Sequence, residues 1–453
     1  MTLPRRLVIV VRADPVICGH SGEARNLAEV ALTRGSTDVR LLTWPIETLQ
    51  AAGLPMKPLD RLLPYSPGIT VERPAPVGDY RVPDGRHLAG LTGRLVELLA
   101  EPVPTVCLSM YLVPHTQVVN DAVHAARAAG FAPDVRTVAK AVGSDVTNVI
   151  RSCLREGRFG AATVLMTTFL ANDQVVAVSE YTREEIVAAA EQVDAHSGTD
   201  FAEQCRQRVT VSYPPIDSSA FLDLDPARVD AALARRGLQR DGYILFLSRV
   251  ARAKGIYDLV IAYGQMRCRD DVKLVVAGTG PALGHVQAMA KEDDRIIFLT
   301  DVDDDEKPLL MRGCAAYTLP TKPEPDFVET FGIALAEKML AGGGPIVTTL
   351  TGGTGEAVGD TAVIVEPGDI AALAEAIDRV VLDMSPAQRR DLEVRARARA
   401  MSFDRVAVFD SLFPPPGDAV PVDGRMPRQL MESAFRAIDA PVCVSEDGVD
   451  FPR

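Results

Sequence analysis

Two glutamates with a glycine between them are the first residues whose types and spacing suggest chemistry. Glu329 and Glu337 lie on either side of Gly332, after an apolar run that ends near Leu319. If a helix begins near Phe331, Glu329 lies at its start and Glu337 about two turns inside. Free N–H groups at a helix start bind anions, and carboxylates accept hydrogen bonds from vicinal hydroxyls. The segment therefore predicts a polyol site, and a capping glutamate plus a surface glutamate is the alternative.

A second group of residues is basic. Arg249 and Lys254 directly follow the apolar run Tyr243–Leu247, and Gly255 comes next, where a helix can begin. Arginine presents a planar fork and lysine a compact charge, so together they could neutralise a diphosphate. The alternative is a solvated basic loop.

A glycine-rich loop in the first half is the third candidate. Gly19 and Gly22 lie in the segment Cys18–Glu23, just before a helical pattern that runs to Thr33. Glycines let backbone approach a ligand closely, and a helix N-terminus favours phosphate. A tight turn alone would also account for them.

Short apolar runs that alternate with Ala-rich helical stretches must position these groups. Nearly continuous apolar strands separated by helices predict parallel sheets covered on both faces. The fold class is therefore α/β, with two doubly wound, Rossmann-like domains of about six strands facing a central cleft. The predicted strands are Leu7–Val11, Val39–Leu42, Thr105–Leu108, Val135–Ala139, Val175–Val178, Val209–Ser212, Tyr243–Leu247, Lys273–Ala277, Arg295–Leu299, Ala315–Leu319, Ile346–Thr348 and Ala362–Val365.

Prolines mark the expected boundaries. Tyr213–Asp217, with two prolines, is the predicted linker and hinge, and Phe413–Gly417 is a second break. We expect an N-terminal Rossmann-like domain at 1–215, a C-terminal Rossmann-like domain at 216–401, a helix at 402–413 and a Pro/Asp-rich extension at 414–453. That extension contains one short helical candidate, Arg428–Ala437.

Composition excludes several classes of protein. The chain has 48 Lys+Arg against 61 Asp+Glu, a net charge of −13, which argues against nucleic-acid binding. No apolar run approaches the length of a membrane span, so stable membrane insertion is not expected. Seven cysteines without a C-x-x-C pair favour a cytoplasmic protein, and six scattered histidines argue against zinc.

Five motifs in register resemble those of glycosyltransferase family 4, which has the GT-B fold. The resemblance covers most of residues 5–412. Its motifs are Gly19/Gly22, Arg249/Lys254, Gly278-Thr279-Gly280-Pro281, Glu329/Glu337 around Phe331-Gly332, and Gly352-Gly353-Thr354-Gly355-Glu356.

The resemblance implies a retaining hexosyltransferase that uses a nucleoside diphosphate sugar, with no metal and no bound cofactor. Arg249 and Lys254 would then hold the diphosphate, while Glu329 faces the sugar and Glu337 the ribose. The further donor-binding residues that it implies are Gly19, Gly22, Gly278 and the backbone of Phe331, Gly332 and Ile333. The acceptor is expected to be small and soluble, a sugar, a cyclitol or a natural-product hydroxyl. The oligomeric state is left open.

The sequence departs from the family in the first half. Many members carry H-G-S-D where this chain has Val142 before Gly143-Ser144-Asp145, so an imidazole is missing. His115 could take the sugar-facing role, beside Arg249, Lys254 and Glu329 as catalytic candidates. Ser144, Asp145 and Arg151 are the acceptor-side candidates. Arg151, Arg155 and Arg158 form one helical stripe that either grips an acidic acceptor such as a sugar phosphate or faces solvent.

Other functions stay open. Gly278-x-Gly280, with Asp301 about twenty residues on, is part of a dinucleotide-binding pattern, but Leu283 replaces its third glycine. That pattern would make the chain an oxidoreductase. An epimerase of the same fold and a non-catalytic nucleotide-sugar-binding homologue are further alternatives. The acidic run 301–306 is interpreted as a solvated loop rather than a metal-binding motif.

Overall fold

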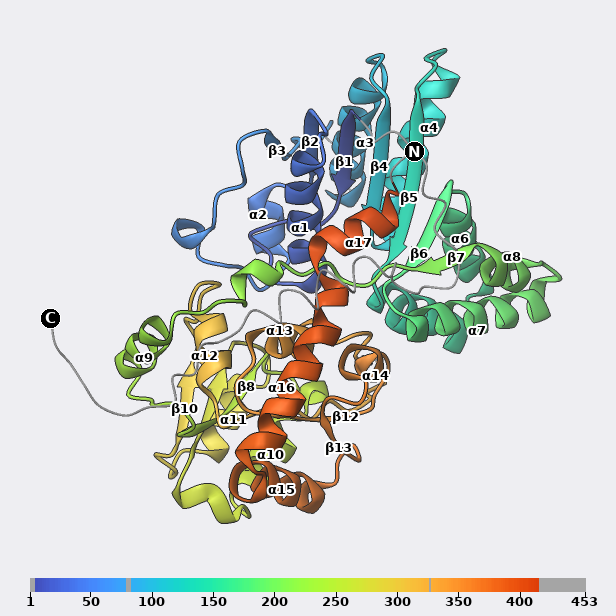
Figure 1. Cartoon of the computed structure of the whole chain (residues 1–453). Coiled ribbons are helices and arrows are strands. Elements are labelled where there is room, and N and C mark those ends of the chain that lie inside the picture. The colour runs from blue at the N-terminus through green and yellow to red at the C-terminus, as the bar shows by residue number, and fades with distance from the viewer. Residues whose placement is uncertain (1–4, 79–82, 326, 415–453) are drawn as a thin grey trace, which may run out of the picture. The chain divides into compact units, whose positions relative to one another are not determined.

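The computed structural model describes residues 5–78, 83–325 and 327–414, which contain two parallel sheets (Figure 1). The strands of the first sheet are β1 (Arg6–Val10), β2 (Asp38–Leu42), β3 (Ile69–Glu72), β4 (Thr105–Met110), β5 (Val135–Ala141), β6 (Gln174–Ala177) and β7 (Val209–Val211). They lie in the order β3-β2-β1-β4-β5-β6-β7.

The second sheet is built from the following part of the chain. Its strands are β8 (Tyr243–Leu247), β9 (Lys273–Ala277), β10 (Ile296–Leu299), β11 (Ala316–Leu319), β12 (Ile346–Thr349) and β13 (Val363–Val365). They lie in the order β10-β9-β8-β11-β12-β13. Two doubly wound parallel sheets confirm the predicted fold class, and both belong to one compact unit of the chain.

Helices connect the strands. Those of the first half are α1 (Gly19–Thr33), α2 (Ile46–Ala51), α3 (Pro83–Leu99), α4 (Gln117–Ala128), α5 (Arg151–Arg155), α6 (Phe159–Leu170), α7 (Glu180–Ser197) and α8 (Phe201–Arg208). Those that follow are α9 (Pro226–Arg235), α10 (Ile256–Tyr263), α11 (Leu283–Met289), α12 (Lys307–Gly313), α13 (Ile333–Ala341), α14 (Thr354–Val358), α15 (Ile370–Asp378), α16 (Pro386–Ala400) and α17 (Arg405–Leu412).

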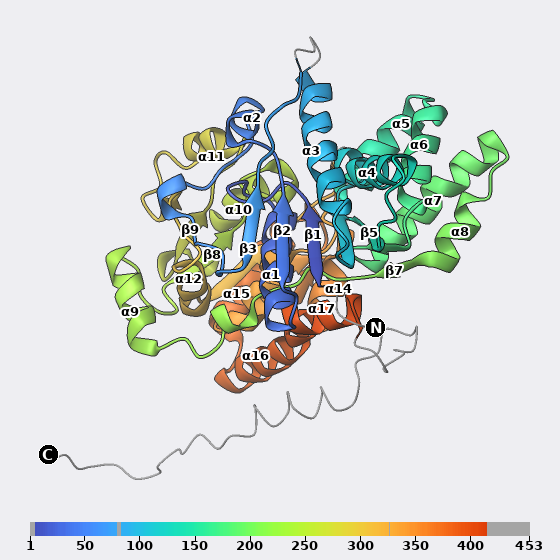
Figure 2. The same cartoon turned by 90° about the horizontal axis from the view of Figure 1, so that it is seen from above.

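The apolar character of the strands follows from burial on both faces. In β1, Leu7 and Ile9 pack into the core under α1 and α17, whereas Val8 and Val10 pack against α3 and α4 (Figure 2). Successive side chains of a strand point to opposite faces, so both sets must be apolar.

The strand order reverses once in each sheet. In the first sheet the chain goes from β1 outward to β3, then returns to place β4 on the other side of β1. In the second, β8 and β11 are the neighbours at the reversal. Loops after these strands diverge and leave room for a ligand at the carboxyl edge of the sheet. The Arg249 loop follows β8 and the Glu329 segment follows β11.

Two details differ from the prediction. The first sheet has a strand that the sequence did not reveal, β3, which pairs with β2 at the edge of the sheet. Helix α1 begins at Gly19, so the glycine-rich loop is itself the first turn of the helix.

Helix α17 joins the first sheet although it follows the second in the chain. Phe409, Leu412 and Phe413 are buried in the same core as β1 and α1. The linker and the returning segment are tied together, because Ile216 N–H donates to Phe403 O and Arg405 N–H donates to Ile216 O, both at 2.8 Å. The predicted helical segment Arg428–Ala437 lies outside the described residues.

Candidate functional site

The basic loop after β8 presents one cation without a partner. Arg249 is exposed and forms neither an ion pair nor a hydrogen bond with any described residue. A guanidinium placed this way contributes little to stability and is available to an anion.

Lys254 and Glu329, which are far apart in the chain, meet in an ion pair. Their side chains are only 14% and 12% exposed. The Lys254 ammonium also lies 5.0 Å from the ring centroid of Phe327. The structure thus brings the basic motif and the first glutamate of the acidic motif together at the strand reversal.

Gly255 allows this approach. Its φ is +71°, and a Cβ there would overlap the carbonyl oxygen of Pro320, the residue after β11. The backbone of the loop after β8 therefore packs directly against the backbone of the loop after β11. This close packing places Lys254 beside Glu329.

Gly255→Ala is expected to destabilise the protein by about 2–4 kcal/mol, from the left-handed φ and the overlap together. Gly237→Ala is the matched control, because Gly237 has a φ of +65° and nothing within 4 Å of its Cβ position. That variant should lose only about 1 kcal/mol. Urea unfolding measures both, and equal losses would contradict the role given to Pro320.

Glycines after β9 pack the basic loop from its other side. A Cβ on Gly278 would overlap Ser248 O, and one on Gly280 would overlap Val250 O. Val250 N–H donates to Thr279 O at 2.8 Å. These glycines position the Arg249 loop, and a direct contact of Gly278 with a donor stays a prediction.

Helix α13, which contains Glu337, begins at Ile333, two residues later than predicted. Gly332 precedes it with a φ of +94°. The N–H groups of Ile333 and Ala334 donate to no acceptor among the described residues, so they remain open to a ligand. The Phe331 ring is buried, 4.9 Å from the Phe403 ring, and leaves only its backbone for binding.

Glu337 lies about one turn inside α13, not two. Its carboxylate binds the Lys307 ammonium at 2.7 Å. Burial alone would lower the pKa of the Lys307 ammonium. The negative charges of Glu337 and Asp304 together have a larger, opposite effect, so the pKa is raised. Contact of Glu337 with a ribose stays a prediction.

The interpretation of residues 301–306 as a solvated loop holds for four of its five acidic side chains, which are exposed, and fails only at Glu306. Asp301 and Glu306 bind Arg236 at 3.0 and 2.6 Å, and Glu306 is buried. Asp304 binds Lys57 at 2.7 Å. Because Asp301 is already paired, its predicted alternative use as a ribose-binding acid loses support.

The glycine-rich loop of the first half faces the start of α13. A Cβ on Gly19 would lie 3.0 Å from Ile333 Cδ1, whereas one on Gly22 would meet nothing within 4 Å. The first turns of α1 and α13 therefore approach each other. Two helix N-termini that converge favour an anion between them.

His115 has both ring nitrogens engaged. Nδ1 lies 2.6 Å from Met110 O, and Nε2 accepts from Trp44 Nε1 at 3.1 Å. Burial lowers the pKa of His115 to about 4, despite the bond to Met110 O. The imidazole is therefore neutral near pH 7, and its sugar-facing role stays a prediction.

Acidification is expected to destabilise the protein through His115. The unfolded chain binds this proton below pH 6.5 and the folded chain only near pH 4, so stability falls as the pH drops through that window. The contribution is roughly 3 kcal/mol. An NMR titration of the ring, assigned with His115→Gln, should give a midpoint near pH 4. A midpoint at the ordinary value would contradict the buried, neutral imidazole.

Asp145 is held by backbone. Its carboxylate accepts from the N–H groups of Leu112, Val142 and Gly143 at 3.2, 3.3 and 2.9 Å. Burial raises its pKa to about 6, against the lowering effect of these bonds. Ser144 hydrogen-bonds the Tyr111 side chain. Asp145 thus fixes the loop, and acceptor contacts of Ser144 and Asp145 stay predictions.

Two members of the predicted arginine stripe are paired. Arg151 forms an ion pair with Glu185, and its Nη2 lies 3.4 Å from Tyr181 Oη. Arg158 pairs with Glu156 at 2.8 Å. Acceptor binding by Arg151 stays a prediction, but its charge is already compensated.

Arg12, which the sequence did not single out, and Glu356, the last residue of the fifth motif, also belong to these loops. Arg12 lies two residues after the end of β1, and its Nη2 is 3.2 Å from His20 Nε2. Its position after the first apolar run was the available signal. Glu356 accepts from the N–H groups of Glu180 and Tyr181, both at 2.7 Å, and so caps α7 of the first sheet. No sequence pattern indicated that partner.

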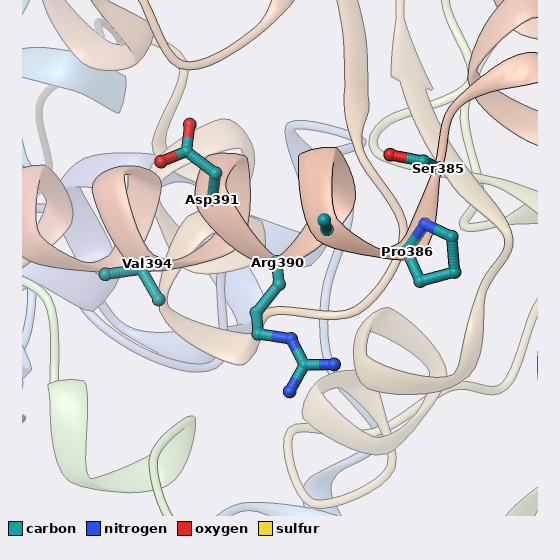
Figure 3. A pocket seen from close by; sticks show the side chains of 6 residues that line it. Ser385, Pro386, Arg390, Asp391 and Val394 are labelled. Carbon is teal, nitrogen blue, oxygen red and sulfur yellow. The ribbon is translucent and has the colours of Figure 1, made fainter.

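A surface hollow on α16 is unrelated to these loops (Figure 3). It is lined by Ser385, Pro386, Ala387, Arg390, Asp391 and Val394. The Arg390 and Asp391 side chains point away from each other, so the hollow gathers no converging polar groups.

Within residues 5–78, 83–325 and 327–414, no helix combines the length and apolarity needed to cross a membrane. No cluster of three or more His, Cys, Asp or Glu side chains there could hold a metal ion.

Part of the second half is similar in sequence to known glycosyltransferases. Residues 241–383 match the family described as glycosyl transferases group 1. The chain is 33% identical to the glycogen synthase of Mycobacterium tuberculosis over 181 residues, which are 38% of this chain and 42% of that enzyme. It is 29% identical to N-acetyl-alpha-D-glucosaminyl L-malate synthase of Bacillus anthracis over 159 residues, 34% of this chain and 39% of that one. The match thus spans about two fifths of each relative.

Solved structures share the whole fold. HepE of Anabaena, in complex with UDP and glucose, has a TM-score of 0.62 at 19% identity over 90% of this chain and 98% of its own. Sucrose-phosphate synthase of Thermosynechococcus elongatus has a TM-score of 0.63 at 19% identity over 95% and 99%. These likenesses confirm the GT-B fold, and the family match confirms the resemblance carried by the motifs. Residues 241–383 are therefore similar to the glycosyl transferases group 1 family, in a chain with the GT-B fold.

Proposed function

We propose that the chain is a retaining, metal-independent glycosyltransferase. It transfers a hexose-type unit from a nucleoside diphosphate sugar to the hydroxyl of a small soluble acceptor in the cytoplasm. No bound cofactor is required, since the sugar nucleotide is a co-substrate. One observation supports the proposal most strongly. Arg249, which pairs with no described residue, lies on the same loop as Lys254, at the strand reversal of the second sheet. That loop also places Lys254 in an ion pair with Glu329.

The catalytic role of these residues is to stabilise the leaving group. The bond between the anomeric carbon and the diphosphate oxygen breaks, and the acceptor oxygen bonds to the same face of the sugar. The acceptor proton passes to the departing diphosphate. Negative charge grows on that diphosphate, where Arg249, Lys254 and the open N–H groups of α13 can receive it.

The relatives support this reading in part. Two of them are named as a glycogen synthase and an N-acetyl-alpha-D-glucosaminyl L-malate synthase, and each name describes a product that contains a sugar unit. HepE was also solved in complex with UDP-glucose, which makes UDP-glucose the first donor to test.

Thermal denaturation with nucleotides tests the proposal. UDP, GDP, ADP, dTDP and NAD are each added at millimolar concentration to the wild type and to Arg249→Gln. A ligand at about 100 times its Kd stabilises the native state by roughly 2.7 kcal/mol. One nucleoside diphosphate should raise the wild-type Tm, and the shift should shrink in the variant. A shift with NAD alone would overturn the proposal in favour of an oxidoreductase.

A further inference from the structure

A second uncompensated cation lies at the strand reversal of the first sheet. Arg12 follows β1, Tyr111 follows β4 and Ser144 follows β5, and these three strands are neighbours (Figure 1). Arg12 is half-buried. Burial raises the pKa of the Tyr111 phenol, and the charge of Arg12 lowers it by a smaller amount. The net shift is upward, so the phenol stays neutral near pH 7.

Among residues 5–78, 83–325 and 327–414, no carboxylate forms an ion pair with Arg12. Its Nε is buried without a hydrogen bond to any described residue. Its side chain contacts His20 Nε2 at 3.2 Å and the Cys18 thiol, and neither group is a carboxylate. Burial, followed by the charge of Arg12, lowers the pKa of His20 well below its usual range, so this partner is neutral near pH 7.

The acidic groups close to Arg12 in the chain or on the neighbouring loops are engaged elsewhere. Asp14 binds Arg25 at 2.7 Å. Glu23 binds Lys140 at 2.8 Å. The Asp145 carboxylate accepts three backbone N–H groups. A half-buried guanidinium without a counter-charge is unfavourable unless an anion binds to it.

We propose that Arg12 binds an anionic group, a phosphate or a carboxylate, carried by the acceptor. This inference rests on the proposed function and names its acceptor class: an acidic sugar or cyclitol instead of a neutral one. The guanidinium fork matches the oxygens of either group, and the Ser144 and Tyr111 hydroxyls lie on the adjoining loops. Arg151, the acceptor-side candidate from the sequence, is already neutralised by Glu185.

Equilibrium dialysis of the full chain tests the assignment directly. The probes are radiolabelled glucose 6-phosphate, glucuronate and glucose, and the variants are Arg12→Gln, Arg12→Lys and Arg127→Gln. Arg127 is the matched control, because it is an exposed arginine on α4 that forms no ion pair with described residues. One of the two anionic probes should bind the wild type at least ten times more tightly than glucose does. Arg12→Gln should abolish that preference, Arg12→Lys should keep part of it, and Arg127→Gln should keep all of it.

The two anionic probes identify the group, since preference for glucose 6-phosphate indicates a phosphate and preference for glucuronate a carboxylate. Equal binding of all three probes to the wild type, or unchanged preference in Arg12→Gln, overturns the inference. Urea unfolding of Arg12→Gln should show no loss of stability, since the variant removes an unbalanced charge. A clear loss would instead assign Arg12 a structural role.

A nucleotide titration separates this inference from the proposed function. The nucleoside diphosphate that stabilises the wild type should bind Arg12→Gln with an affinity within twofold of the wild type, and Arg249→Gln much more weakly. If Arg12→Gln loses nucleotide affinity as Arg249→Gln does, Arg12 belongs to the donor subsite and the inference fails. If no nucleotide binds but anion preference still depends on Arg12, the proposed function fails and the anion site stands.

Discussion

Arg249→Ala is expected to lower turnover about 100- to 1000-fold, the range found when one group that stabilises developing charge is removed. The guanidinium is exposed and pairs with no described residue, so its removal should change the free energy of unfolding by less than about 0.5 kcal/mol. A large loss of rate without a loss of stability is what a group used only in the reaction produces. The measurement is release of nucleoside diphosphate from the donor that raises the Tm, alongside urea unfolding.

Arg252→Ala controls for loss of positive charge in the same loop. Arg252 is 71% exposed and pairs with Glu324 at 3.0 Å, away from the Lys254–Glu329 pair. Its variant should keep a rate near that of the wild type. Lys254→Ala should also lower turnover. It leaves Glu329 without its counter-charge, however, so a loss of stability could account for part of the loss of rate. A wild-type rate for Arg249→Ala would rule out the diphosphate role of this loop.

Lys140→Met is expected to destabilise the protein by about 3–5 kcal/mol. The Lys140 ammonium lies 2.8 Å from the Glu23 carboxylate, and the two side chains are 0% and 4% exposed. Lys140 Nζ also donates to Tyr213 O at 3.3 Å. Removing the lysine leaves a buried carboxylate without a counter-charge, which is the main cause of the loss. Urea unfolding followed by circular dichroism measures it.

The double variant Lys140→Met/Glu23→Leu should lose less than Lys140→Met, because no charge is then left buried alone. Arg158→Met breaks an ion pair of similar length, 2.8 Å, whose side chains are 70% and 50% exposed. It should lose less than about 1 kcal/mol. A Lys140→Met variant as stable as Arg158→Met would show that Glu23 does not depend on this lysine.

The buried strands and the loops after them were predictable because their signal is local. The run Tyr243–Leu247 is apolar, and Arg249 and Lys254 had to follow it at the edge of the sheet. Strand β3 was missed because it is a four-residue edge strand with one exposed and three half-buried residues, between proline-rich segments. An edge strand with little burial carries no strong apolar run.

The pairing state of the charges could not be predicted. Glu23, eleven residues after Arg12, is bound instead by Lys140, which lies on a strand more than a hundred residues away. The same holds for Arg151, which Glu185 neutralises from another helix. Sequence spacing identifies a charged side chain, but the fold decides whether that charge is already satisfied.

The position of α17 also sets an order of events during synthesis. The ribosome releases the first sheet well before Phe409 and Leu412, which complete its core. Until then the nascent first half exposes the apolar face of α1 that these residues cover, and such surfaces promote aggregation. A fragment that ends at the linker should therefore need a chaperone or precipitate. Chimeras that exchange the second half with a relative should keep this chain's own last helix.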